Sequence, residues 1–360
     1  MILDRSDEHQ GAWFLFILAC LVVVVYGLKF AAPILLPSAL ALFLAILTLP
    51  LMGFLQRRRL PARLAIFLTV MVTVAALGLL GLLASQSFSQ LQEQLPRYAV
   101  RLQTLQESWV SSLERRLGLE LDPYISTELI NPAAVVDFVG ATVGRIAQFV
   151  SSTFLVFLIM VFMLGEATVF PEKMKAIWGT GADEEGRLGK VVLEVQTYLG
   201  IKTVVSVATG LILGGFAYLM KLDFPVLLGV IAFALNYIPT VGSIIAAVPA
   251  ILLSLVLHGT LTHALIVSGG YLAVNTLIGN LLEPNLMGRR LGMSTLVVVL
   301  SLIFWGWTWG PLGALLSVPL TVVVKIWLEN TLDLRWVAIL LDKAPPASGE
   351  GEDAPYPGPA

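Results

Sequence analysis

The stretch that most constrains the fold is residues 235–249, LNYIPTVGSIIAAVP, which places two prolines, a glycine and several polar residues inside apolar sequence. Pro239 cannot donate a backbone hydrogen bond, and its ring disfavours the helical conformation of the residue before it. A helix that begins near Phe224 is therefore expected to stop near Tyr237, and Gly242 then allows the chain to turn. These residues exclude one continuous helix through the stretch.

Two short helical arms flank this break. Residues 224–237 would form a helix about 21 Å long and residues 243–257 one about 22 Å long, whereas the hydrocarbon core of a bilayer is about 30 Å thick. Neither arm crosses the membrane alone, so the pair is expected to form a re-entrant hairpin with its tip at residues 236–243. Irregular backbone at membrane depth must be buried in protein or face a water-filled cavity, and transporters build binding sites in this way.

The composition is that of a polytopic membrane protein. Hydrophobic residues make up 57% of the chain and charged residues 13%, which is about half the charge that soluble domains carry. The formal net charge of −2 leaves no basic face for a nucleic acid once the loops are assigned. The single cysteine, Cys20, excludes an intramolecular disulfide and a thiolate metal site. The sequence also has no metal-ligand spacing, and neither a metal nor a cofactor is expected.

Six stretches are long and apolar enough to cross the membrane once each. The expected spans are residues 13–30, 31–52, 64–83, 146–165, 200–220 and 261–282. Four arginines crowd the loop after the second span, at Arg57, Arg58, Arg59 and Arg63. The positive-inside rule therefore places this loop and both termini in the cytoplasm. The expected fold is an all-α polytopic membrane protein of about six spans and two re-entrant hairpins.

Between the third and fourth spans, residues 85–145 are too polar to cross the membrane but keep apolar residues at steps of three and four. This spacing is typical of an amphipathic helix, so the segment is expected to be an external helical subdomain. Its apolar stripe either makes a coiled-coil-like contact between protomers or packs on its own chain or on the bilayer surface.

Residues 294–328 contain a second break, with the sequence WGWTWGP at residues 305–311. As one helix this stretch would be about 52 Å long, which is too long for the bilayer. A second hairpin that enters from the inside and is broken at Gly310 and Pro311 fits the membrane. Ten simple spans with strained turns are the competing interpretation.

The two hairpins resemble each other in sequence. VGSIIAAVP in the first matches LGALLSVP in the second with one gap, and the matched pairs are Gly242 with Gly313 and Pro249 with Pro319. Each hairpin follows one span, and these two spans run in opposite directions. Residues 200–257 and 258–330 are therefore expected to form an inverted-topology repeat whose broken tips meet near the middle of the membrane.

The sequence thus divides into six parts. They are residues 1–84, the N-terminal membrane helices; 85–145, the external subdomain; 146–199, the fourth span and a cytoplasmic segment; 200–257 and 258–330, the two repeats; and 331–360, a cytoplasmic tail. The tail is rich in Pro, Gly and acidic residues, so it is expected to be largely disordered.

The polar residues of the first tip are the candidates for substrate binding. Asn236, Tyr237, Thr240 and Ser243 either bind a polyhydroxylated or cyclic polar substrate or satisfy the broken backbone of the tip. In the span between the hairpins, Thr276, Asn280 and Glu283 fall on one face at about 100° per residue. Thr276 and Asn280 on this face offer further hydrogen bonds to a substrate.

Charged residues near the inner end of the spans are the candidates for coupling. Glu283 is either a proton or cation acceptor that biases the site or an interface carboxylate paired with Arg289. Lys202, at the start of the fifth span, either extends to the inner interface or contacts an anionic substrate.

At these residues the chain resembles the autoinducer-2 exporter family. The resemblance is carried by IAFALNYIPTVGSIIAAVP, GNLLEPNLMGRRLGMSTLVV, FWGWTWGPLGALLSVPLT and FAAPILLPSALALFLAILTLPL, and it extends to about residue 330. Thr240, Asn285 and Arg290 depart from the family pattern. The resemblance implies a bacterial inner-membrane exporter of autoinducer-2 or a related small polar metabolite, working by alternating access. It also implies a homo-oligomer and points to a pentamer in contact with membrane lipid.

A cation/proton antiporter and a non-transporting scaffold are the alternatives to an exporter. A sodium or other cation/proton antiporter needs an acidic residue inside the membrane, and apart from Glu283 the core hairpins hold none. A non-transporting membrane scaffold would make the hairpin tips purely structural. An enzyme is not expected, because His258 and His263 sit in a short outer turn without carboxylate or cysteine partners nearby in sequence.

Overall fold

The structure is a computed structural model, and it describes residues 10–117, 153–170, 172–173, 176, 182–239, 241–287, 293–329, 331 and 335–342. Within these ranges the elements are helices, with no strand. Seven of the described helices are long and apolar enough to cross a membrane. The expectation of an all-α polytopic membrane protein is confirmed at this level. The chain divides into two compact units, residues 1–44 with 292–360, and residues 45–291.

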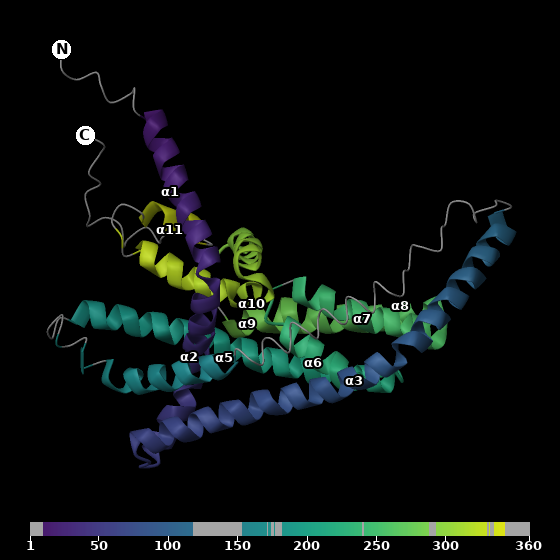
Figure 1. Cartoon of the computed structure of the whole chain (residues 1–360), viewed down its shortest axis with the longest axis horizontal. Coiled ribbons are helices and arrows are strands. Elements are labelled where there is room, and N and C mark those ends of the chain that lie inside the picture. The colour runs from purple at the N-terminus through teal and green to yellow at the C-terminus, as the bar shows by residue number, and fades with distance from the viewer. Residues whose placement is uncertain are drawn as a thin grey trace. The chain divides into compact units, whose positions relative to one another are not determined.

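The larger unit holds the first helix break, between α6 and α7, and the helices around it. After the end of α2 (Ala32–Arg57) its elements are α3 (Ala62–Leu117), the helix Thr153–Phe170, α5 (Ala182–Leu219), α6 (Pro225–Leu235), α7 (Val241–His258), α8 (Leu261–Val274), the π-helix η2 (Asn275–Leu282) and α9 (Glu283–Met287). In this unit α6 packs against α5, α3 and α7 (Figure 1). Leu213, Leu228, Ala250 and Val267 bring four of these helices into one buried cluster.

Glycines allow α5 and α6 to cross at close range. A Cβ atom on Gly229 would lie 2.7 Å from the carbonyl oxygen of Gly210, and one on Gly210 would lie 2.8 Å from the carbonyl oxygen of Gly229. Side chains at these positions would therefore push the two helices apart. Small residues at a helix crossing are typical of membrane proteins, where close packing replaces the hydrophobic effect as the driving force.

α3 is one helix of 56 residues, and it continues through residue 84, where the sequence suggested a boundary. Leu91 and Tyr98 on its outer part pack against the buried cluster of the same chain. The Tyr98 hydroxyl donates to Asp223 Oδ2 (2.6 Å), and Arg101 Nη2 donates to the carbonyl oxygen of Leu257 (2.9 Å). One turn of α3 thus contacts both the entrance of the α6–α7 hairpin and its exit.

The smaller unit holds the second break. Its elements are α1 (Gln10–Phe30), the first part of α2, α10 (Thr295–Glu329) and α11 (Arg335–Leu341). Gly310 interrupts α10 with φ 70° and ψ −155°. The indole nitrogen of Trp305 donates to Thr321 Oγ1 (3.0 Å), so the chain after the break folds back on the chain before it. Trp309 Nε1 donates to the carbonyl oxygen of Leu28 in α1 (3.0 Å).

Replacing Gly310 by Ala is expected to destabilise this unit by about 1–3 kcal/mol, because an L side chain rarely adopts its positive φ with an extended ψ. Gly306→Ala is the matched control in the same helix, since its Cβ would make an ordinary 3.5 Å contact with Ala314 Cβ. Thermal unfolding of the two purified variants in detergent measures the difference. Equal melting temperatures would contradict the role given to Gly310.

One secondary-structure expectation was wrong. Residues 261–282 were expected to form a uniform α-helix, but from Asn275 the helix changes to π-helical hydrogen bonding. The one-face argument at 100° per residue therefore does not hold between Thr276 and Glu283. The predictions for Thr240, Arg289 and most of the tail concern residues outside the described ranges, as does much of the external subdomain.

Candidate substrate site at the hairpin tip

The break between α6 and α7 is a tight turn. α6 ends at Leu235, and the amide of Ile238 donates to the Leu235 carbonyl oxygen (2.9 Å). The Gly242 amide donates to the Ile238 carbonyl oxygen (3.3 Å), one residue into α7. A Cβ atom on Gly242 would overlap the Leu235 carbonyl oxygen, so only glycine fits this turn. Pro239, which lacks the N–H that a continuing helix needs, lies at the centre of the break.

A polar face of α5 holds the tip. Asn236 Nδ2 donates to Ser206 Oγ (3.0 Å), and the Tyr237 hydroxyl donates to Thr203 Oγ1 (2.8 Å). Asn236 is 8% exposed and Ser206 is fully buried. Breaking either bond would leave a polar group buried without a partner, which is destabilising. The two bonds therefore fix the turn on α5.

A small polar cavity lies beside the tip. It has a volume of about 10 Å³, close to what one water molecule needs. The polar residues that line it come from α5, the α6–α7 turn, α7, α8 and η2 and are Thr209, Asn236, Ser243, Tyr271 and Asn275. No charged side chain belongs to its described lining.

Two hydroxyl groups of this lining are buried without a hydrogen-bond partner among the described residues, Thr209 Oγ1 and the Tyr271 hydroxyl. Thr209 is 5% exposed and Tyr271 4%. An unpaired buried hydroxyl is destabilising, so each such group calls for an explanation. Hydroxyl and amide groups without a charge are suited to a neutral molecule that both donates and accepts hydrogen bonds.

A buried ion pair lies close to the tip contacts, because Lys202 directly precedes Thr203 and lies one helical turn before Ser206. Lys202 Nζ is 2.5 Å from Glu283 Oε1, and the two side chains are 4% and 15% exposed. Glu283 follows η2 directly. The pairing of Glu283 is therefore with Lys202 among the described residues, and Lys202 is directed into the protein.

The predicted substrate residues occupy different surroundings. Asn236 and Ser243 line the cavity, and Tyr237 is half-buried on Thr203. Thr276 and Asn280 have exposed side chains, whereas Asn275 and Gly279 line the cavity.

The sequence reasoning missed the contribution of α5 and α8, namely Thr203, Ser206, Thr209 and Tyr271. A signal was present in α5, because its polar residues recur at steps of three within an apolar span. The α-helical period places such residues on one face.

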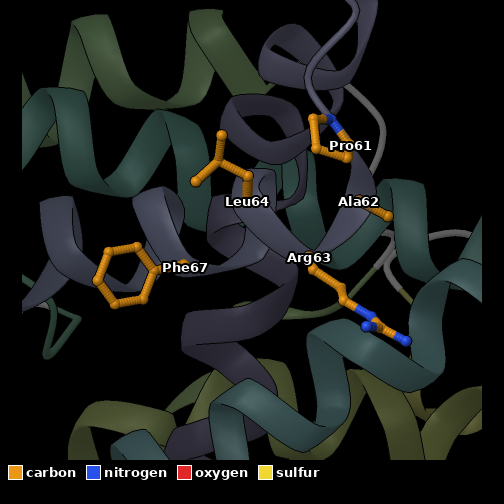
Figure 2. A pocket seen from close by; sticks show the side chains of 5 residues that line it. All are labelled: Pro61, Ala62, Arg63, Leu64 and Phe67. Atoms are coloured by element: carbon orange, nitrogen blue, oxygen red, sulfur yellow. The ribbon is translucent and has the colours of Figure 1, made fainter.

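A larger hollow lies elsewhere, at the start of α3. It has a volume of about 700 Å³, is open to the surface and is lined by Pro61, Ala62, Arg63, Leu64 and Phe67. Figure 2 shows that the Arg63 and Phe67 side chains point in different directions and do not converge on a ligand. Its lining offers one charged group and no buried polar atom, so the tip cavity is the better candidate.

Comparison with known proteins places these features in a family context. The model of the AI-2E family transporter matches residues 18–333. The AI-2 transport protein TqsA of Escherichia coli is 38% identical over 332 residues, covering 92% of this chain and 96% of the relative. The putative transport protein YhhT of Escherichia coli is 38% identical over 344 residues, 95% and 98% of the two chains. A putative transport protein of Haemophilus influenzae is 37% identical over 332 residues, 90% and 94% of the two chains.

Proposed function

The chain belongs to the AI-2E family of transporters, and from this premise we propose that it exports a small, neutral, polar metabolite, autoinducer-2 or a related signal. The observation that carries the proposal is the cavity at the hairpin tip, with its two unpaired hydroxyls. The relative TqsA bears the name of an AI-2 transport protein, and its similarity covers nearly the whole chain. Asn236, Ser243, Thr209 and Tyr271 are the proposed binding groups, with Tyr237, Thr240, Thr276 and Asn280 as further candidates from the sequence.

The depth of the cavity supports a binding role. Ser206, the partner of Asn236, lies about 20 Å along α5 from its last residue, Leu219, while the hydrocarbon core is about 30 Å thick. Polar groups at this depth are expensive and are found mostly on substrate pathways. A purely structural turn would be expected to satisfy the buried polar groups around it internally, as it does the Asn236 amide and the Tyr237 hydroxyl.

Transport also requires the tip to move, because a cavity of about 10 Å³ is far too small for a metabolite. We propose alternating access by two re-entrant hairpins of an inverted repeat, residues 200–257 and 258–330. The matched glycines support the repeat: a Cβ on Gly242 would overlap the Leu235 carbonyl oxygen, and a Cβ on Gly313 would overlap the Trp305 carbonyl oxygen. Each hairpin thus uses its glycine to let one arm approach the other.

The proposal includes the cellular setting. We place this multi-pass protein in the bacterial inner membrane with both termini in the cytoplasm, as a homo-oligomer surrounded by lipid. The arginines at the end of α2 and in the loop after it support this orientation, because Arg57, Arg58 and Arg59 are exposed and adjacent in sequence.

Thr209→Val and Tyr271→Phe test the function directly. Each variant removes an unpaired buried hydroxyl without changing the size of the side chain much, so folding should be unaffected or slightly favoured. If these hydroxyls bind substrate, export should fall about tenfold, which corresponds to about 1.4 kcal/mol of lost binding. The measurement is uptake of autoinducer-2 and related polyols into sealed inverted vesicles, with and without pH and sodium gradients.

The matched control is Thr197→Val. Thr197 lies on the same helix, but its hydroxyl donates to the Leu193 carbonyl oxygen away from the cavity (2.7 Å). Transport by this variant should stay near that of the parent protein. Unchanged export in both cavity variants would overturn the assignment of the site.

A second candidate function is cation/proton antiport, and the Lys202–Glu283 pair is the observation that favours it. A carboxylate that is 15% exposed beside a lysine can exchange a proton or a cation. Arg289, close in sequence, is a further candidate for this role. Cation-dependent proton movement in vesicles without any metabolite, abolished by Glu283→Gln, would favour antiport over export.

A further inference from the structure

The Lys202–Glu283 ion pair joins α5 to the first residue of α9, directly after η2, and both α5 and η2 line the tip cavity. Lys202 lies in α5, one turn before Ser206, which holds the tip. Glu283 directly follows η2, whose Asn275, Ile278 and Gly279 line the cavity. The ion pair therefore holds η2 against the helix to which the tip is bound.

The segment before Glu283 has a π-helical hydrogen-bond register. The Glu283 amide donates to the Ile278 carbonyl oxygen, five residues earlier, which is the π-helical pattern. π-Helical turns are rare and frequently lie at functional sites. In an α-helical pattern the Glu283 amide would donate to Gly279 in place of Ile278. This change of register would rotate the Glu283 side chain about the helix axis, away from Lys202. Pro284, next in the chain, has no amide hydrogen to hold either register.

The burial of the ion pair fits a role in a conformational change better than a role in stabilising the fold. A buried ion pair seldom stabilises a fold more than well-packed apolar residues of similar size would. A single buried charge that has lost its partner is strongly destabilising. The pair can therefore part only when water or a substrate reaches both groups. Opening of the adjacent cavity would supply that water.

We propose that Lys202 and Glu283 form a latch that keeps the tip cavity closed on the η2 side and parts once in each transport cycle. The latch rests on the proposed function in that it assigns the cavity to the transport path. In this proposal Lys202 and Glu283 position the elements around the cavity and do not bind substrate themselves, because neither residue lines the cavity. The shift of η2 from π to α register is the movement that separates them.

The test measures access to the cavity and needs no substrate. In a Cys20→Ser background, which removes the only cysteine, Ser243→Cys reports on the cavity. Lys202→Glu and Glu283→Lys each place like charges together, so the cysteine at 243 should react at least about tenfold faster with a water-soluble thiol reagent. The double variant Lys202→Glu/Glu283→Lys restores the opposite charges and should return the rate to near that of the background.

A second reporter separates opening of the latch from unfolding. Ser254 is fully buried in α7 and does not line the cavity. With the latch as proposed, Ser254→Cys stays unreactive in the single reversals while the cavity reporter becomes reactive. Equal gains at both reporters would show a merely structural pair, and no gain at 243 would show that the pair does not close the cavity. Either result overturns the latch, whereas normal latch behaviour without metabolite export would count against the proposed function alone.

Discussion

Gly242→Ala is expected to prevent the α6–α7 hairpin from folding. The added methyl group would overlap the backbone carbonyl oxygen of Leu235 and press on Ile238 Cβ at 3.2 Å. A backbone atom cannot move aside as a flexible side chain can, so the turn itself must open. The expected loss is about 3 kcal/mol or more, at the upper end of overpacking effects. The measurement is the melting temperature of the purified protein, together with the yield of monodisperse protein in detergent.

The matched control is Gly269→Ala in α8. No heavy atom lies within 4 Å of the Cβ position there. Alanine has a higher helix propensity than glycine by about 1 kcal/mol, so this variant should be as stable as the parent or more stable. If Gly242→Ala instead melts with the parent protein, the close approach of Gly242 to Leu235 is not a requirement of the fold. The proposed geometry of the tip would then have to be abandoned.

The contrast between these glycines shows what the sequence predicts well. The breaks at Pro239 and at Gly310 follow from local chemistry, because a missing amide hydrogen or a positive φ interrupts a helix whatever surrounds it. The structure has both interruptions where the sequence suggested them. Membrane spans are predicted for a similar reason, since the bilayer demands a certain length of apolar helix. By the same measure α7 is long and apolar enough to cross, where the sequence predicted an arm too short to do so.

The partners of the tip could not be predicted in the same way. Asn236 meets Ser206, 30 residues away, and Glu283 meets Lys202, 81 residues away. Nothing local specifies such pairs, whereas the predicted partner of Glu283, Arg289, is close to it in sequence and lies outside the described ranges. The π-helical register of η2 also depends on packing, so an α-helical period selected Thr276 and Asn280 where the cavity has Asn275 and Gly279.

α3 illustrates a different limit. The fall in hydrophobicity near residue 84 predicts where the chain leaves the bilayer, but it carries no helix-ending signal. The helix continues to Leu117 and even accommodates Pro96. The outer part then docks on the same chain at Asp223 and Leu257, which agrees with one of the two alternatives for the apolar stripe.

Cysteine labelling at the two ends of the first hairpin should give the same face of the membrane for both. The positions are Lys221 and Thr260, which are exposed in the turns before α6 and after α7. In the Cys20→Ser background, Lys221→Cys and Thr260→Cys should both react with a membrane-impermeant thiol reagent in intact cells. Arg58→Cys, exposed in the loop after α2, should react only after the membrane is opened.

The reason lies in the contacts of α3 with the hairpin. Tyr98 binds Asp223 and Arg101 binds Leu257, and these α3 residues are separated by about 4.5 Å along the helix axis. The two ends of the hairpin therefore both lie against one turn of α3. A chain that crossed the bilayer between them would need ends about 30 Å apart, and α3 could not bind both within one turn. If Lys221→Cys and Thr260→Cys react from opposite faces, the hairpin crosses the membrane, and the polar cavity at Asn236 no longer marks the end of a re-entrant path.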